Sequence, residues 1–133
     1  MSEPRPKPHI LVVDDDTNIR AFLKEILTDD GYEVSLSENG LEALDDARQL
    51  RPDLILLDLW LPGRSGEEVC KAIRGDEDEN FRRTPILMVT GKDSDVEEVI
   101  GMAVGATSYL SKPVPMPVLL KEVKRCLSLP KAA

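Results

Sequence analysis

Short apolar runs alternate with amphipathic segments along most of the chain. Three runs are continuously apolar and of strand length, which is typical of strands covered on both faces of a sheet; they span residues 10–13 (ILVV), 54–57 (LILL) and 86–89 (ILMV). Residues 32–37 (YEVSLS) instead alternate, with Val34 and Leu36 on one face, and residues 107–110 (TSYL) form a short run. These two segments are predicted to be the edge strands.

Five amphipathic segments follow these strands in turn, with apolar residues three or four positions apart, as on one face of a helix. The helices are predicted to begin at Thr17 or Asn18, at Asn39, at Ser65, at Asp93 or Ser94, and at Pro115 or Met116. Their expected buried faces are formed by Ile19, Phe22, Leu23, Ile26 and Leu27, by Leu41, Leu44 and Ala47, by Val69, Ala72 and Ile73, by Val96, Val99, Ile100 and Ala103, and by Val118, Leu119, Val123 and Leu127.

Five successive strand–helix units predict an α/β fold, in which right-handed crossovers build one parallel sheet with helices on both faces. Placing the continuous runs in the centre and the other two strands at the edges gives the order 2-1-3-4-5, a flavodoxin-like doubly wound arrangement with five helices. The domain is expected over residues 9–129, between a flexible lead-in at 1–8 and a tail at 130–133. Residues 75–84 (GDEDENFRRT) are expected to form a charged, solvated loop.

The chain has 133 residues and a formal net charge of −8. This charge argues against nucleic-acid binding by this domain and favours cations or basic partners. No apolar run is long enough to cross a bilayer and the N-terminus lacks the apolar core of a secretory signal, so we expect a cytoplasmic protein with no membrane contact. Cys70 and Cys126 fall at apolar helical positions and are expected to be small buried hydrophobes rather than a disulfide.

Polar residues follow the predicted strands at the points where these leave the core. Asp14 and Asp15 follow the first strand, Asp58 the third, Thr90 the fourth and Lys112 the fifth. In a parallel sheet these strand ends meet at one edge, and ligands bind there, near the point between strands 1 and 3 where the strand order reverses. Each residue is unremarkable alone, but their combination predicts a site.

Several like charges at one edge raise the free energy of the fold unless cations compensate them. Lys112 and a divalent cation are the candidates, and carboxylate oxygens suit Mg²⁺, which completes its shell with water and phosphate oxygens. The Thr90 hydroxyl and the Lys112 ammonium also suit phosphate oxygens. The combination therefore predicts a magnesium site that receives a phosphoryl group, whereas Asp16, directly before the first helix, is expected to be a helix cap.

Four segments carry a resemblance to a known family: ILVVDDD, LLDLWLPG, ILMVTGKD and ATSYLSKP. The sequence resembles the receiver domain of bacterial two-component response regulators, of the chemotaxis-regulator type, over residues 8–129. The resemblance implies that Asp58 accepts a phosphoryl group from a histidine kinase or a histidine phosphotransfer protein, as in a phosphorelay. It also implies a signalling domain rather than an ordinary enzyme, one that promotes its own aspartyl phosphorylation and dephosphorylation.

The resemblance further implies a set of metal ligands. Asp15 and Asp58 would bind Mg²⁺ directly, together with the backbone carbonyl of Trp60, and Asp14 would act mostly through water. No other cofactor is implied. Trp60 and Lys92, each two residues past a site residue, would flank the route of hydrolytic water and so tune the lifetime of the phosphoryl group.

Further roles in transfer and switching also follow from the resemblance. Lys112 would pair with the phosphoryl oxygens, and its peptide bond to Pro113 is expected to be cis. Thr90 would be the switch hydroxyl, with Tyr109 changing rotamer in step; the alternative for Tyr109 is a half-exposed edge-strand aromatic that does not switch. The switched surface, formed by the fourth helix, the fifth strand and the fifth helix, would bind a downstream protein. His9, at the opposite end of the sheet, is expected to be structural.

Other functions agree less well with the sequence. A haloacid-dehalogenase-type phosphatase carries a second Asp two residues after its nucleophile, where this chain has Trp60, and the anionic DDDTN segment does not suit a flavin or nucleotide phosphate. A degenerate receiver, acting as a phosphorylation-independent interaction module, would lack one of the five polar site residues, and all five are present. From the ending LSLPKAA we expect a stand-alone regulator without an output domain, and the alternative is a fragment of a longer protein. The receiver is expected to be monomeric or weakly dimeric on phosphorylation.

Overall fold

A computed structural model describes residues 7–91 and 95–129 as one sheet between two layers of helices. The strands are β1 (His9–Val13), β2 (Glu33–Ser37), β3 (Leu54–Leu57), β4 (Ile86–Thr90) and β5 (Ser108–Ser111). The helices are α1 (Thr17–Asp29), α2 (Gly40–Leu50), α3 (Gly66–Arg74), α4 (Glu79–Arg82), α5 (Asp95–Ala103) and α6 (Met116–Ser128). The predicted lead-in and tail, and the predicted caps Asp93 and Ser94, lie almost wholly outside the described residues.

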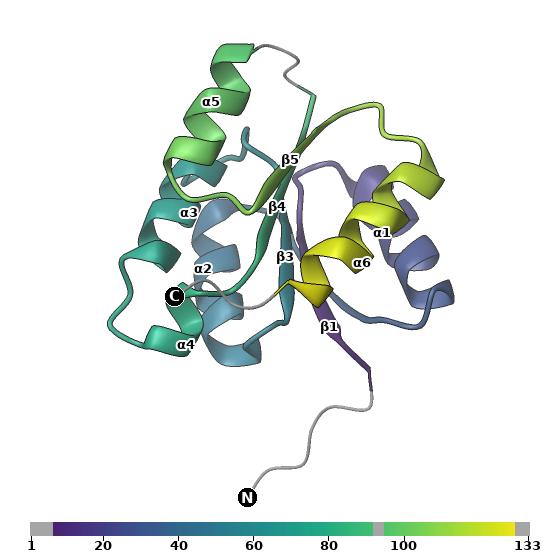
Figure 1. Cartoon of the computed structure of the whole chain (residues 1–133), viewed down its shortest axis with the longest axis horizontal. Helices are drawn as coiled ribbons and strands as arrows, with labels where there is room; N and C mark the ends of the chain where they lie inside the picture. Colours follow the sequence, from purple (N-terminus) through teal and green to yellow (C-terminus); the bar gives the residue numbers. More distant parts are fainter. Residues whose placement is uncertain (1–6, 92–94, 130–133) are drawn as a thin grey trace, which may run out of the picture.

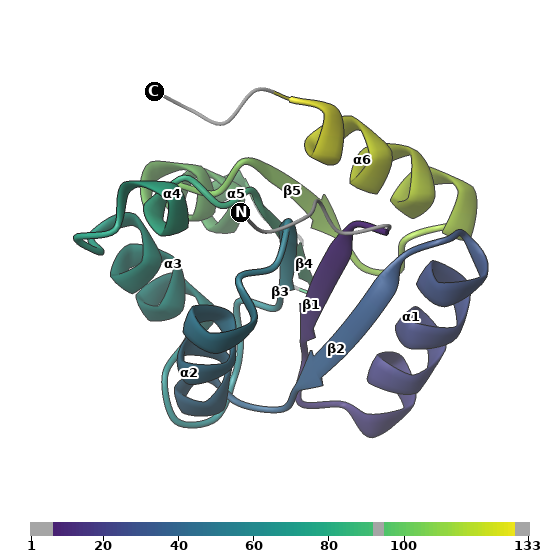
Figure 2. The ribbon, with the colours of Figure 1, turned by 90° about the horizontal axis from the view of Figure 1, so that it is seen from below.

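The strands are all parallel and lie in the order β2-β1-β3-β4-β5, which confirms the predicted topology. Figure 1 shows α1 and α6 on one face of the sheet and α2, α3, α4 and α5 on the other. Figure 2, seen from below, shows β2 at the edge beside β1. The three continuously apolar runs are the central strands, because only central strands bury side chains on both faces.

The core has one part on each face of the sheet. Along β1, Ile10 and Val12 pack with the buried side chains of α1 and α6, whereas Leu11 and Val13 pack with those of α2 and α3. This separation follows from the two-residue period of a strand, which sends neighbouring side chains to opposite faces. The apolar run therefore contributes equally to both helix layers and holds the carboxyl end of β1 in place.

The two cysteines confirm their predicted role. Cys70 and Cys126 are buried and free, and they belong to different parts of the core, on opposite faces of the sheet. Burial raises the pKa of the Cys70 thiol to about 11. A thiol with so high a pKa is almost wholly protonated at neutral pH and therefore unreactive.

Side-chain caps begin the first three helices. Asp16 caps α1 by accepting from the backbone N–H groups of Asn18 and Ile19, at 2.8 and 3.1 Å, which confirms the cap expected at Asp16. Thr17 and Asn18 are the first two residues of the helix and do not cap it. The predicted caps of α2 and α3, Asn39 and Ser65, are confirmed. Each cap satisfies helical N–H groups that have no partner within the helix.

The prediction of a solvated loop over residues 75–84 was wrong. This stretch contains α4, a sixth short helix beside the five predicted ones, and its Phe81 is only 2% exposed. The Asp78 carboxylate caps α4 by accepting from the N–H of Phe81 at 3.1 Å. The buried ring explains the error, because one aromatic side chain can fold a charged segment onto the core without any helical period in the sequence.

Four large apolar residues that were predicted to face inward do not. Leu41 of α2 is 59% exposed, Phe22 of α1 53%, Val99 of α5 65% and Val118 of α6 46%. The helical period correctly identified the buried faces, for example Leu44 and Ala47 on α2, but it overestimated their width. Among the described residues, no helix combines the length and the hydropathy that crossing a membrane requires.

Candidate phosphoryl-transfer site

The carboxyl ends of the strands bring four polar residues of the predicted site together. Asp14 and Asp58 directly follow β1 and β3, which are neighbours in the sheet, and the N–H of Asp58 donates to the carbonyl of Val13 at 3.0 Å. Thr90 is the last residue of β4. Lys112 directly follows β5, and its N–H donates to the carbonyl of Thr90 at 2.8 Å. Backbone pairing thus sets the positions of these residues before any side chain is considered.

Three carboxylates form a cluster at this edge. One oxygen from each of Asp14, Asp15 and Asp58 lies within 4.8 Å of the others. Asp14 and Asp58 are only 3% and 8% exposed, whereas Asp15 is exposed. Among the described residues, Lys112 is the cation that pairs with the cluster, and its Nζ lies 2.5 Å from Asp14 Oδ2 and 3.0 Å from Asp58 Oδ2.

Backbone groups hold the second oxygen of each buried carboxylate. The N–H of Asp16 donates to Asp14 Oδ1 at 2.9 Å, and the N–H of Trp60 donates to Asp58 Oδ1 at 3.0 Å. Arg20 of α1 donates from Nη1 to the carbonyl oxygen of Asp14 at 2.6 Å. Arg20 was not predicted from the sequence, since its place in an amphipathic helix resembles that of any surface arginine.

The pKa values reflect this crowding of charge. Burial raises the pKa of Asp14, and the hydrogen bond from Lys112 only partly offsets that rise, while the Asp58 charge adds to it. Burial alone would lower the pKa of Lys112, but hydrogen bonds and charges from Asp14 and Asp58 outweigh burial and raise it. Two carboxylates that share one ammonium therefore keep Lys112 protonated and leave negative charge uncompensated.

The donor set suits a hard divalent cation. Mg²⁺ prefers oxygen ligands and is usually bound through one or two carboxylates, with waters and phosphate oxygens completing the shell. The cluster of Asp14, Asp15 and Asp58 provides carboxylate oxygens near one another, and one of them, Asp15, is open to solvent. The excess of negative charge over the single Lys112 ammonium makes an added cation favourable.

Thr90 adds an unsatisfied polar group to the site. Its side chain is fully buried, and its Oγ1 has no hydrogen-bond partner within the described part of the chain. Buried hydroxyls are normally hydrogen-bonded, so an exception calls for an explanation such as a ligand or a second conformation. A group bound at the mouth of the site would supply the missing partner.

Comparison with known proteins identifies the family. The model of the response regulator receiver domain matches residues 10–124. The chain belongs to this receiver-domain family. The receiver is 42% identical over 118 residues to the response regulator MprA of Mycobacterium tuberculosis, and 39% identical over 118 residues to the DNA-binding response regulator MtrA of the same species. Each match covers 89% of this chain and 50% of the relative, so the receiver spans about half the length of these curated relatives.

Solved structures agree with this assignment. The chemotaxis response regulator CheY4 of Vibrio cholerae has a TM-score of 0.83 and 39% identity, covering 90% of this receiver and 98% of that chain. A response regulator of Chloroflexus aurantiacus has a TM-score of 0.86 and 33% identity, covering 92% of this receiver and 99% of that chain. These relatives confirm the flavodoxin-like architecture expected from the sequence.

Of the remaining predicted features of the receiver, all but Lys92 lie within the described part of the chain. The Lys112–Pro113 peptide bond is cis, as predicted, and Trp60, two residues after Asp58, is 53% exposed. Tyr109 is half-buried on β5, and its ring lies 3.3 Å from where a Cβ of Gly101 would be. Lys92 lies outside the described residues.

His9 occupies the opposite end of the receiver's sheet, at the start of β1. Its Nε2 lies 2.7 Å from Ser35 Oγ on β2, and its N–H donates to Asp53 Oδ2 at 2.7 Å. The buried imidazole therefore joins β1 to β2, and the backbone of His9 joins β1 to the segment before β3. These contacts agree with the structural role expected for this histidine.

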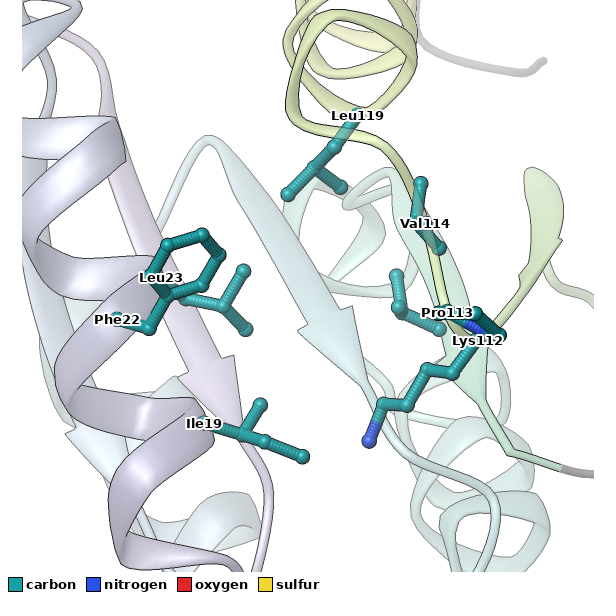
Figure 3. A pocket seen from close by; sticks show the side chains of 8 residues that line it. Ile19, Phe22, Leu23, Lys112, Pro113, Val114 and Leu119 are labelled. Carbon is teal, nitrogen blue, oxygen red and sulfur yellow. The ribbon is translucent and has the colours of Figure 1, made fainter.

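An apolar groove flanks Lys112 on the α1 side of the receiver. Its volume is about 410 Å³, and it is lined by Ile19, Phe22, Leu23, Val89, Lys112, Pro113, Val114 and Leu119. Figure 3 shows the three side chains of α1 facing the segment from Lys112 to Leu119 across this groove. Phe22 is exposed because it lies on the rim of the groove rather than in the core.

Proposed function

We propose that Asp58 of this receiver accepts a phosphoryl group from a phosphohistidine of a histidine kinase or a phosphotransfer protein, with Mg²⁺ bound beside it. The observation that carries the proposal is the charge balance at the strand ends. Three carboxylates lie together there, and the described cation that pairs with them is the single ammonium of Lys112. Such a site favours additional positive charge and, next to it, the oxygens of a phosphoryl group.

The metal ligands proposed are Asp15, Asp58 and the backbone carbonyl of Trp60, with Asp14 acting through water. The clustering of the three carboxylates and the hydrogen bond of the Trp60 N–H to Asp58 Oδ1 support this set. When bound, Mg²⁺ would supply positive charge to the carboxylates and to the phosphoryl oxygens. Asp15 is the exposed member of the cluster and gives the cation a route from solvent.

Phosphoryl transfer needs positioning and charge neutralisation more than covalent assistance. An Asp58 carboxylate oxygen would form a bond to phosphorus while the bond between phosphorus and the donor's imidazole nitrogen breaks. The Lys112 Nζ would bind a phosphoryl oxygen, and its distance of 3.0 Å from Asp58 Oδ2 supports this role. The unpartnered hydroxyl of Thr90 would donate to another, which would satisfy a buried group at the same time.

The phosphoryl group would then act as a switch. An aspartyl phosphate adds roughly −1.5 to −2 charge, if phosphomonoester values transfer, and attracts Thr90 and Lys112. Both residues adjoin β5, so their movement would bias the surface formed by α5, β5 and α6, with Tyr109 changing rotamer in step. Exposed apolar side chains on α5, Val99 and Met102, support this surface as the place where a downstream protein binds. Trp60 and Lys92 are proposed to tune the phosphoryl lifetime.

The phosphodonor protein must cover the mouth of the site to bring its histidine to Asp58. The surface beside that mouth includes the apolar groove between α1 and the segment after Lys112. Exposed apolar rims with nearby charges are typical of protein–protein contact sites. We therefore propose that the donor protein covers Phe22 and the groove during transfer.

Labelling with a small acyl phosphate and Mg²⁺ tests this function. The wild type should incorporate a phosphoryl group, and Asp58→Asn should abolish incorporation because the attacking carboxylate is gone. Mass spectrometry measures the incorporation, and Asp45→Asn, an exposed carboxylate on α2, is the matched control that should label normally. Persistent labelling of Asp58→Asn would disprove the assignment of Asp58. An unlabelled wild type would instead favour a phosphorylation-independent interaction module.

The location and the oligomeric state of the receiver are further parts of the proposal. We propose a cytoplasmic receiver that is monomeric or weakly dimeric on phosphorylation, and the matched region is about half the length of the curated relatives. The formal net charge of −8 supports basic protein partners rather than nucleic acid for this domain. Size measurements with and without the acyl phosphate would test the oligomeric state.

A further inference from the structure

The loop that follows Asp58 is held by two glycines at the beginnings of neighbouring helices. This β3–α3 loop comprises residues 58–65 and contains both Asp58 and Trp60. Gly66, the first residue of α3, donates from its N–H to the carbonyl of Leu59 at 2.9 Å. Gly40, the first residue of α2, donates from its N–H to the carbonyl of Pro62 at 3.2 Å. The loop is thus bonded to α3 near its start and to α2 near its middle.

Neither glycine leaves room for a side chain. A Cβ at Gly66 would lie 2.1 Å from the carbonyl oxygen of Asp58 and 2.9 Å from the Cα of Leu59. A Cβ at Gly40 would lie 1.9 Å from the carbonyl oxygen of Arg64. The atoms approached belong to the backbone and cannot rotate away, so a methyl group would push the loop outward by about 1 Å or more before ordinary contact distances were restored.

The need for space, not for backbone freedom, explains these two glycines. Positive φ angles among the described glycines occur at Gly31, Gly63 and Gly105, so Gly40 and Gly66 have backbone conformations that other residues adopt. Two helices therefore begin with glycine at points where only the absence of a Cβ lets them approach the loop.

The loop has few other means of staying in place. Leu59 is buried, but the Trp60 side chain is 53% exposed and Pro62 and Gly63 are exposed as well. Leu41 of α2, although 59% exposed, lies over the loop at Gly63, with its Cδ1 3.6 Å from where a Gly63 Cβ would be. Backbone contacts with α2 and α3 therefore hold the outer part of the loop where side-chain burial does not.

We propose that Gly40 and Gly66 are positioning residues, which set the β3–α3 loop so that the backbone carbonyl of Trp60 can serve the metal beside Asp58. The inference rests on the proposed function and adds a second helix, α2, to the parts of the chain that support the site. A ligand carried by backbone is moved only by moving the backbone, and productive sites tolerate shifts of about 0.5 Å. A methyl group at either glycine exceeds that tolerance.

The test compares Mg²⁺ affinity with stability in alanine variants. Trp60 is the single tryptophan, so its fluorescence reports Mg²⁺ titrations, and urea unfolding without metal reports stability. Gly66→Ala should weaken Mg²⁺ binding roughly 10-fold, as changes behind metal ligands commonly do, and Gly40→Ala should weaken it by a smaller factor. Labelling by the acyl phosphate should recover at saturating Mg²⁺, because these glycines touch no reacting atom.

Two controls separate positioning from general destabilisation. Gly75→Ala makes the same chemical change at the other end of α3, where the new Cβ would lie 3.3 Å from the Lys71 carbonyl oxygen. Leu44→Ala removes a buried side chain from α2 and should lower stability. Both controls should bind Mg²⁺ with wild-type affinity. Glycine variants that lose stability while keeping wild-type Mg²⁺ affinity would overturn the inference and leave a packing role alone.

A third variant covers the case in which neither glycine variant folds. Leu41→Ala removes the exposed side chain of α2 that lies over the loop, without introducing a clash, and should weaken Mg²⁺ binding by a smaller factor than Gly66→Ala. The neighbouring exposed Glu42→Ala should leave it unchanged, and equal affinities in these two variants would overturn the inference. If the wild type is labelled and the glycine variants bind Mg²⁺ with wild-type affinity, this inference alone is wrong. If the wild type neither binds Mg²⁺ nor is labelled, the proposed function is wrong as well.

Discussion

The two ends of the sheet differ in how they treat buried polar groups. At the amino-terminal ends of the strands such groups are paired: the His9 ring meets Ser35 Oγ at 2.7 Å, and the backbone of His9 both donates to and accepts from Asp53. At the carboxyl-terminal ends, Asp14 and Asp58 share one ammonium. The first end stabilises the fold, whereas the second keeps charge and hydrogen-bonding capacity for a ligand.

Arg74 shows how complete the pairing is at the amino-terminal end. Its guanidinium, at the end of α3, donates to the carbonyls of Gly105, Arg82 and Thr84 at 2.7–2.8 Å and to Thr107 Oγ1 at 3.4 Å. It thereby joins α3 to the segments that lead into β4 and β5. Burial lowers the pKa of Arg74, yet the group stays charged because arginine titrates far above neutral pH.

The difference between the two ends indicates where polar groups kept for function lower the stability of the fold. A buried charge without full compensation and a buried hydroxyl without a partner both lower stability. Natural proteins retain such features chiefly at functional sites, and changes that remove them commonly stabilise the fold. Substitutions at the two ends should therefore change stability in opposite directions.

The largest expected effect is at the paired end. Arg74→Ala should lower the free energy of unfolding by about 3 kcal/mol, because it removes a charged donor and leaves several carbonyls unsatisfied. Urea unfolding measures this loss, and Lys71→Ala, an exposed residue on the same helix, should change it by less than about 0.5 kcal/mol. Folded Arg74→Ala should still be labelled at Asp58; a loss of labelling in the folded protein would show that the two ends are coupled.

A smaller effect of opposite sign is expected at the crowded end. Asp14→Asn should raise the free energy of unfolding in metal-free buffer by about 1–2 kcal/mol, since it removes a buried charge and leaves Asp58 paired with Lys112. Mg²⁺ at 100-fold over the wild-type Kd should stabilise the wild type by about 2.7 kcal/mol. The same Mg²⁺ concentration should stabilise Asp14→Asn by less. Thermal or urea unfolding with and without Mg²⁺ distinguishes these cases. A destabilised metal-free Asp14→Asn would mean that Asp14 is fully compensated.

Much of this arrangement could be predicted from the sequence because it depends on strand ends. The apolar run of β3 matches its predicted bounds, and parallel pairing places whatever follows the strands at one edge. That principle located Asp14, Asp58, Thr90 and Lys112, although Lys112 and Asp14 lie 98 positions apart in the chain.

The errors have a different origin. Helical period identifies a buried face but not its width, so Leu41 was placed inside, and one buried ring, Phe81, folds α4 without any period to reveal it. Gly40 and Gly66 were not singled out at all. A glycine required for close approach looks like any other glycine until the approaching backbone is known.

Two threonines provide the most direct comparison between the ends. Thr84, before β4, donates from Oγ1 to the carbonyl of Phe81 at 2.7 Å, whereas Thr90, at the end of β4, has a buried Oγ1 without a partner in the described structure. Replacing either by valine exchanges a hydroxyl for a methyl group of nearly the same size. Thr84→Val should therefore lower the free energy of unfolding by about 1 kcal/mol, and Thr90→Val should raise it by about the same amount.

Urea unfolding of the two variants in metal-free buffer measures both signs in one experiment. Thr84→Val should keep the wild-type rate of labelling by the acyl phosphate. In Thr90→Val, phosphorylation should no longer change the surface formed by α5, β5 and α6, because no hydroxyl would be left to donate to the phosphoryl group. Stabilisation of Thr90→Val with this functional loss would show that the missing hydrogen bond is reserved for the phosphorylated state. Destabilisation of both variants by similar amounts would instead show that Thr90 already has a partner in solution, and that the two ends of the sheet do not differ in this respect.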